Sequence, residues 1–224
     1  MKKKGIALLL VMVVTMAFCI SGCGKAEQES AGKSEAAAEK GTEVIQETEE
    51  DVTEAIAEEP EVDGSAYGYA GDDPVEAAVY KYMAEEKSKD YDAADAHIPT
   101  VNVVAVDYTP EDEVLVYGDF WIENYNIEGD TLKCASGGNY PGVMHVSKKD
   151  YSVTGFDQVA DGEDFESSAK ELFGENYDDF MKVYSDSDAR NELRKITVSD
   201  YVNMNGLSVT QYQDEGWDPV KLYK

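Results

Sequence analysis

The sequence has few of the residues that build common metal and nucleotide sites. Its only two histidines, His97 and His145, lie in different segments, and it has neither an HExxH pattern nor a CxxC pair. A zinc site needs several such ligands at short spacing, so zinc is not expected. The Gly137-Gly138 pair is not followed by Lys-Ser or Lys-Thr, as a phosphate-binding loop would be. We therefore expect no metal and no cofactor.

Positive charge is also scarce. Nineteen Lys and Arg stand against 47 Asp and Glu, which gives a formal net charge of −28. Nucleic-acid binding depends on cationic groups that neutralise phosphates, so we expect no nucleic-acid partner. Segment 157–168 has the Asp161-Gly162 pair of a calcium loop, but Val159 and Ser168 stand where an EF-hand needs carboxylates. A turn before a helix with Asp164 at its N-cap is the simpler prediction, and calcium binding stays open.

Long hydrophobic runs are absent after residue 20. Residues 2–4 are lysines, and the apolar run that follows is shorter than the roughly 20 residues of a membrane-spanning helix. This pattern predicts a secretory signal. The next residues, Ile20-Ser21-Gly22-Cys23, resemble the lipobox of bacterial lipoproteins. A plain secretory signal or an unprocessed membrane helix would leave the position of this cysteine unexplained.

The lipobox resemblance implies an address and an anchor. In that family the signal, here residues 1–22, is removed, and the thiol of Cys23 carries a diacylglycerol, often with a further acyl group such as palmitate. Stable anchoring takes more than one acyl chain, at about 0.8 kcal/mol for each buried methylene. We therefore expect Cys23 to be the lipid attachment site and the protein to lie on the extracytoplasmic face of the cell membrane.

Residues 23–73 have the composition of a linker. Between residues 24 and 73 there are three lysines and 16 acidic residues, and no aromatic residue precedes Tyr67 and Tyr69. Such a segment cannot bury enough apolar surface to become ordered. We predict an acidic disordered tether with a reach of roughly 40 Å. The alternatives are a transient helix around residues 44–56 and an acidic segment that captures cations or basic partners.

Residues 74–224 have the size of one domain. Asp73-Pro74 is a helix start, and apolar residues at helical spacing predict a helix over 75–89. Five short strands separated by turn signals follow, with residues 137–142 as a loop or bulge. They cover residues 101–108, 114–126, 131–136, 143–147 and 151–156. We expect an antiparallel sheet of about five strands.

The last third of the chain is predicted to be mainly helical. The helices cover residues 164–173, ending at Gly174, then 176–184 and 186–203, and a closing strand is possible within 207–222. This order predicts an α+β domain. It resembles the cone-shaped NTF2-like and cystatin-like folds. It also resembles uncharacterised extracellular lipoprotein domains that carry Asp119-Phe120-Trp121, Ser136-Gly137-Gly138 and Tyr140-Pro141-Gly142. The resemblance covers about two thirds of the chain and implies no particular active site.

The chain has three cysteines, of which only one would remain as a free thiol. Cys19 leaves with the signal and Cys23 would carry the lipid, so Cys134 has no partner for an intramolecular disulfide. A buried small hydrophobic residue is the ordinary role of such a cysteine. A nucleophilic pair with His145 is the alternative, although no third orienting group accompanies it.

Aromatic residues are the remaining signal. They could line a concave sheet, as ligand pockets are lined, or fill the core. Adjacent residues of a strand face opposite sides, so Phe120 and Trp121 cannot both look into one cavity. We expect most of the aromatic residues to be core, with Trp121, Tyr140 and His145 as candidate ligand-binding residues.

The leading functional prediction is a non-catalytic, lipid-anchored module that binds a small molecule or a protein. The alternatives are a small hydrolase or isomerase, with Asp119, Tyr140, His145 or Cys134 as its polar groups, and a structural envelope protein. An enclosed pocket with convergent polar groups would favour the enzyme. A filled sheet interior with an exposed apolar patch would favour protein binding.

Overall fold

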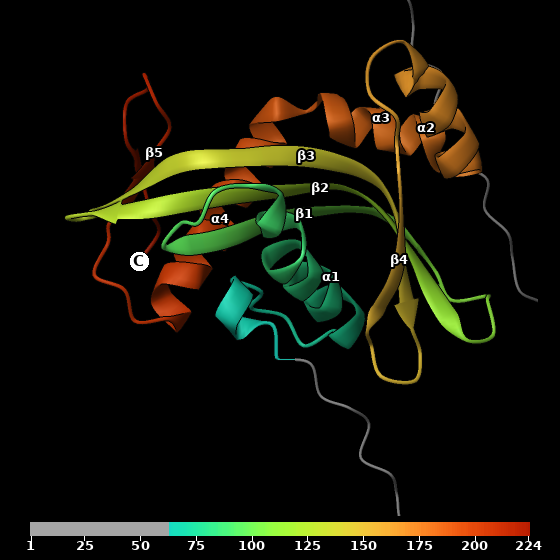
Figure 1. The fold of residues 1–224 in the computed structure, drawn as a ribbon, viewed down its shortest axis with the longest axis horizontal. Helices are drawn as coiled ribbons and strands as arrows, with labels where there is room; N and C mark the ends of the chain where they lie inside the picture. The colour runs from blue at the N-terminus through green and yellow to red at the C-terminus, as the bar shows by residue number, and fades with distance from the viewer. Residues whose placement is uncertain (1–62) are drawn as a thin grey trace, which may run out of the picture. The chain divides into compact units, whose positions relative to one another are not determined.

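A computed structural model describes residues 63–224, which form a curled sheet with helices on both faces (Figure 1). The predicted signal peptide, the predicted lipid attachment site Cys23 and most of the predicted linker lie outside the described residues. The α+β class is confirmed, with an N-terminal helix, a curled sheet and C-terminal helices. Within residues 63–224 no helix has the length and apolar character needed to span a bilayer.

Six strands form the sheet. They are β1 (Ala96–Asp107), β2 (Glu113–Glu128), β3 (Thr131–Ser147), β4 (Val153–Gln158), β5 (Gln211–Gln213) and β6 (Val220–Lys221). The order is β1-β2-β3-β5-β6, and β4 also pairs with β3. All pairs are antiparallel except β3 with β5, so the closing strands make the sheet mixed.

The predicted loop or bulge over residues 137–142 is wrong, because these residues continue β3 in regular register with β2. β2 pairs with them throughout, from Glu123 opposite Gly137 to Gly118 opposite Gly142. The glycines permit close approach of strands rather than a turn: a Cβ atom at Gly142 would overlap the carbonyl oxygen of Asp157 in β4. The irregularity is one extra residue, Ala135, which forms a bulge.

Helix α1 (Pro74–Glu85) packs on one face of the sheet. The Asp73 carboxylate accepts hydrogen bonds from the backbone N–H groups of Val75 and Glu76, which confirms the predicted helix start. The core below α1 consists of fully buried apolar side chains, including Val79, Met83, Phe120, Ile122 and Met144. Burying each of these contributes about 1.5–3 kcal/mol.

A short structured segment precedes α1. The short helix η1 (Ser65–Tyr67) and Tyr69 belong to the segment that the composition assigns to the linker. Both tyrosines pack against the core under α1, and the rings of Tyr69 and Tyr80 lie 5.1 Å apart. A second short helix, η2 (Lys87–Asp90), follows α1 and leads into β1.

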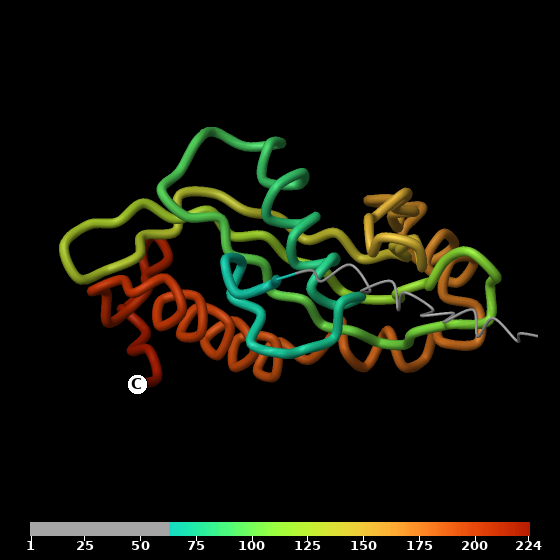
Figure 2. Tube along the Cα trace, turned by 90° about the horizontal axis from the view of Figure 1, so that it is seen from below, coloured from blue at the N-terminus to red at the C-terminus, as the bar shows by residue number. Residues whose placement is uncertain are grey.

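Helix α4 (Ser187–Met204) covers the opposite face, so the strands lie between α1 and α4 (Figure 2). Val198 and Val202 pack there with Ile98, Tyr125 and Leu132, all of which are buried. Side chains thus pack against both faces of the sheet. Most of the aromatic residues belong to these cores, as predicted.

Two short helices, α2 (Phe165–Phe173) and α3 (Tyr177–Ser185), form a third cluster. Short turns η3 (Gly162–Asp164) and η4 (Gly174–Asn176) precede them. Stacked rings of Phe173 and Phe180, 4.0 Å apart, join the pair. Gly174 ends α2 with a φ of 52°, which confirms the predicted C-cap. Asp164 precedes α2 as expected, but its side chain makes no capping hydrogen bond.

Candidate functional site

A row of polar side chains lies between the sheet and α4. Asp119, Trp121 and Glu123 alternate along β2 and therefore share one face. Helix α4 covers them with Arg190 and Arg194, the only two arginines of the chain, about one helical turn apart. The sequence thus places all its guanidinium groups over one acidic strip of the sheet.

Arg190 and Trp121 form the first half of this contact. The guanidinium carbon of Arg190 lies 4.6 Å from the centroid of the Trp121 ring, within cation–π range. The indole Nε1 donates to Asp119 Oδ2 at 3.0 Å, and Asn139 donates to the other oxygen. Burial raises the pKa of Asp119, although both hydrogen bonds act in the opposite direction. Both the ring face and the indole N–H of Trp121 are therefore already in contact with other side chains of the protein.

Arg194 forms the second half and connects three elements. Its Nη1 and Nη2 donate to the Asp214 carboxylate at 2.9 and 2.7 Å. Its Nε donates to the hydroxyl of Tyr125 at 2.9 Å and lies 3.5 Å from Glu123 Oε1. The other oxygen of Glu123 accepts from Thr100 at 3.2 Å. One side chain therefore binds the sheet, α4 and the segment after α4 together.

The charges in this network respond differently to burial. Burial raises the pKa of Glu123 to about 7, because the loss of hydration outweighs the attraction of Arg194. Burial also acts against the charge of Asp214, but the paired hydrogen bonds from Arg194 lower its pKa below the ordinary value. Arg194 itself is held in the charged form, since its partners raise its pKa. The Arg194–Asp214 pair is therefore the ionised part of the network.

Above this pair is an open hollow of about 570 Å³, which we call the C-terminal cleft. Arg194 and Asp214 form its floor. Its walls come from α4 and from the segment that contains β5 and β6, and they include Asn191, Glu192, Lys195, Tyr212, Trp217 and Asp218. Its volume lies in the range of small-molecule sites.

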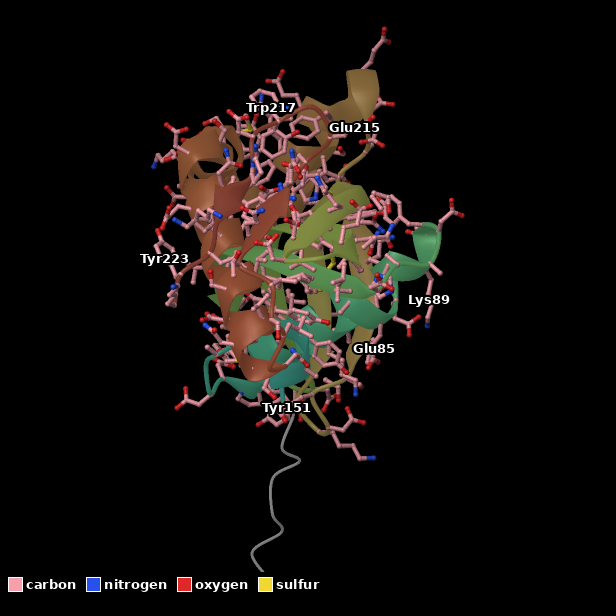
Figure 3. The ribbon with its side chains drawn as sticks, turned by 90° about the vertical axis from the view of Figure 1, so that its left-hand side faces the viewer. Glu85, Lys89, Tyr151, Glu215, Trp217 and Tyr223 are labelled. Carbon is pink, nitrogen blue, oxygen red and sulfur yellow. The ribbon has the colours of Figure 1, made fainter. Side chains whose placement is uncertain are left out.

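Trp217 stands at the rim of the cleft with 75% of its surface exposed. Figure 3 shows it at one end of the domain beside Glu215, with Tyr223 along the same side. Its backbone N–H donates to the carbonyl of Asp214 at 3.2 Å, across a turn in which Gly216 has a φ of 78°. Its own carbonyl accepts from Gln213. The backbone is fixed although the indole is exposed.

The other two candidate ligand residues lie elsewhere. Tyr140 is on the α1 face, where its hydroxyl hydrogen-bonds to Tyr91 at 2.8 Å and Lys87 sits 4.2 Å from its ring centroid. His145 lies further along β3, with Glu113 and Asp157 each 3.1 Å from one of its ring nitrogens. Trp121 and Tyr140 are thus on opposite faces, so the structure does not bring the three residues into one site.

The structure also separates Cys134 from His145. The Cys134 thiol donates weakly to the carbonyl of Ser136, and burial raises its pKa to about 11. It is therefore a protonated thiol at neutral pH, not a thiolate nucleophile. Within residues 63–224 no group of three or more His, Cys, Asp or Glu side chains is arranged to hold a metal ion.

The residues that build the cleft were missed at the level of sequence. Arg190 and Arg194 had a signal, since they are the only arginines and are four residues apart on a predicted helix. Asp214 had none, because its pairing with Arg194 depends on how the segment after α4 folds back. Around Trp217 the sequence has only the turn signal Gly216-Trp217-Asp218-Pro219, which does not indicate a binding residue.

Comparisons with known protein families, curated proteins and solved structures found no match to this chain. A fold class alone does not determine an activity, because unrelated functions share the same architectures. The function is therefore inferred from the chemistry of the cleft and of the network beneath it.

Proposed function

We propose that this protein is a lipid-anchored, extracytoplasmic binding module that takes its ligand in the C-terminal cleft. The observation that carries the proposal is Trp217, a large aromatic side chain that is 75% exposed over a floor fixed by Arg194 and Asp214. Exposed aromatic groups beside preorganised polar groups are typical of binding sites. The lipobox-like segment ending at Cys23 and the acidic residues after it support the anchor and the tether.

Binding is favoured over catalysis by how the polar groups are used. The charged groups on the cleft floor are paired with each other, and neither histidine lines the cleft. A nucleophile and a base within hydrogen-bond reach, the usual arrangement for covalent catalysis, are not present among the residues that line it. The interior of the sheet is filled by side chains such as Phe120 and Tyr125, which are fully buried.

The lining indicates a polar organic ligand. Trp217 offers an aromatic face, Asn191 an amide and Lys195 an ammonium group, while Glu192 and Asp218 offer carboxylates. Some of these groups are already oriented: the Lys195 ammonium lies 3.8 Å from the Tyr223 ring centroid, and the Tyr223 hydroxyl donates to Glu192 at 2.6 Å. A ligand with both a flat or apolar surface and hydrogen-bonding groups matches this lining.

The test is thermal melting of the chain from residue 24 onward, with a panel of metabolites, peptides, glycans and calcium. A ligand at a hundred times its Kd stabilises the folded state by about 2.7 kcal/mol, a readable shift. Trp217→Ala should abolish the shift. Tyr108→Ala, which truncates another exposed aromatic outside the cleft, should keep it. A shift that survives Trp217→Ala, or no shift across the panel, would contradict the proposal.

A further inference from the structure

The outer edge of β3 is open in its middle. This 17-residue strand pairs with β5 through residues 131–133 and with β4 through residues 142–146. The residues between these pairings are hydrogen-bonded to β2 on one side only. In Figure 1, β3 borders the sheet between β5 and β4, and no strand lies beyond it. We call residues 136–141 the β3 open edge.

The direction of the backbone groups along this edge follows from one hydrogen bond. The N–H of Val159 donates to the carbonyl of Pro141 at 2.9 Å, so that carbonyl points away from β2. Backbone groups alternate between the two sides of a strand, so those of Gly137 and Asn139 point outward as well. Within residues 63–224 no other strand, loop or side chain hydrogen-bonds to the backbone of either residue. Both therefore present an unpaired N–H and C=O.

The opposite border of the sheet is protected. On β1, helix α1 packs against the strand, with Tyr80 and Val101 in the same core cluster, and Pro99 has no N–H to offer. Proteins commonly block strand edges in such ways, because an open edge is a template for another strand. At the β3 open edge, Pro141 and the Ala135 bulge would stop strand pairing at the two ends. Between them, the outward backbone groups of Gly137 and Asn139 remain available for hydrogen bonds.

A hollow of about 620 Å³ lies beside the edge. Asp90 and Asp92 line it on one side, and Ala135 and Ser136 of β3 on the other. Asp90 is bound to Lys87 at 2.8 Å, while the exposed Asp92 makes no ion pair within the described chain. The hollow therefore favours a positively charged group next to the strand.

We propose that the β3 open edge binds an extended, basic segment of another protein by strand addition. Backbone hydrogen bonds to Gly137 and Asn139 would supply affinity, and a Lys or Arg side chain beside Asp92 would supply specificity. A second copy of this chain does not fit, because residues 75–224 contain 13 basic and 31 acidic residues and two copies would repel. This surface is separate from the C-terminal cleft and does not depend on the function proposed there.

The probe is a blocked peptide, acetyl-Thr-Val-Thr-Lys-Thr-Val-Thr-amide, compared with the same peptide carrying Glu in place of Lys. The measurement is amide hydrogen exchange and chemical shift by NMR on the chain from residue 24 onward. In the free protein the Gly137 and Asn139 amides should exchange quickly, while those of Ser136 and Gly138, which bond to β2, should exchange slowly. The Lys peptide should slow exchange at Gly137 and Asn139, and the Glu peptide should bind at least tenfold more weakly.

Two charge-matched variants test the specificity. Asp92→Lys should weaken binding of the Lys peptide at least tenfold. Glu111→Lys makes the same change of charge in an exposed turn elsewhere and should leave binding within twofold. Equal losses in both variants would show attraction to the net charge alone and would overturn the proposal. It would also be overturned if the Lys peptide protected neither Gly137 nor Asn139.

Discussion

Arg194 holds Asp214 through both terminal nitrogens, at 2.9 and 2.7 Å, although the two residues are 20 positions apart. Paired hydrogen bonds of this kind are among the strongest that side chains make. The same guanidinium group also touches Tyr125 and lies beside the buried Glu123. The floor of the cleft therefore depends on one side chain, which also adds a polar attachment of α4 to the sheet beside the apolar contacts of Val198 and Val202.

Replacement of that side chain should be costly. Arg194→Met leaves the Glu123 and Asp214 carboxylates without their cation, and we expect a loss of about 3–5 kcal/mol in the free energy of unfolding. Urea denaturation measures it. Arg190→Met is the control and should cost less, because it removes a stacking contact with Trp121 and leaves that network intact. Addition of Glu123→Gln to Arg194→Met should restore part of the loss; equal costs for the two arginine variants would contradict this account.

Glu123 should make the protein less stable as pH rises from about 4.5 to 7. Its pKa is about 7 in the folded chain and 4.5 ordinarily, so the folded state binds the proton more tightly. The contribution to stability is complete below the ordinary pKa and is lost as pH rises through the folded one. In Glu123→Gln this part of the pH dependence should disappear. The difference between the wild-type and variant unfolding free energies, measured across pH 4–8, isolates it from other carboxylates, and a constant difference would contradict the assignment.

His145 should link β4 to β3 most strongly when it is protonated. Burial opposes its charge, but the hydrogen bonds with Asp157 and Glu113 outweigh this and raise its pKa. The raised pKa means that stability is present below about 6.5 and is lost as pH rises through the folded pKa. After correction for the intrinsic rise of amide exchange with pH, the amides of β4 should therefore be less protected at pH 8 than at pH 6. His145→Gln should remove this dependence and His97→Gln, at the Asn124 contact, should keep it.

Gly142 of β3 and Gly155 of β4 should differ in their tolerance of a methyl group. Gly142→Ala places a Cβ atom on the carbonyl oxygen of Asp157 and should destabilise the domain by about 1–3 kcal/mol. At Gly155 the nearest atom, Cδ2 of His145, would be 3.5 Å away, so Gly155→Ala should cost much less. Urea unfolding of the pair compares them. Equal effects would show that close strand contact is not what Gly142 provides.

The lipid anchor has a direct test in cells. When the full chain is produced in a bacterium that processes lipoproteins, labelled palmitate should enter the wild type and remain with the membrane fraction. Cys23→Ser should take up no label and should be released from the membrane. Cys134→Ser is the matched control and should behave as wild type. Label retained in Cys23→Ser would exclude this cysteine as the attachment site.

Local signals predicted much of the fold. Asp73-Pro74 marked the start of α1, Gly174 marked the end of α2, and the strands predicted over residues 143–147 and 151–156 correspond to the end of β3 and to β4, which pair with each other. Each of these depends on nearby residues. The glycines at 137, 138 and 142 led to a wrong prediction, because glycine is common both in turns and where strands approach closely. Only the neighbouring strands determine which of these two roles a glycine has.

The candidate site could not be predicted from local sequence patterns. Asp214, Arg194 and Glu123 come from three segments that meet only after α4 has packed on the sheet and the chain has turned back along β3. Alternation along β2 correctly implied that Phe120 and Trp121 face opposite sides. Nothing in the spacing indicated that Arg190 would cover the Trp121 ring or that Trp217, not Trp121, would be the exposed tryptophan.

The parallel pairing of β5 with β3 sets the order in which parts of this domain should form. Thr131 lies opposite Gln211, 80 residues later, whereas a two-residue turn at Gly129 and Asp130 closes the hairpin of β2 and β3. Contacts between distant residues form late, because a long loop must first be closed. The three-residue β5 and two-residue β6 should therefore join last and open first, as the least stable unit of the domain. A chain clipped after α4 would lack Asp214 and Trp217, and with them the cleft, so the proposed ligand binding would require the whole segment after α4.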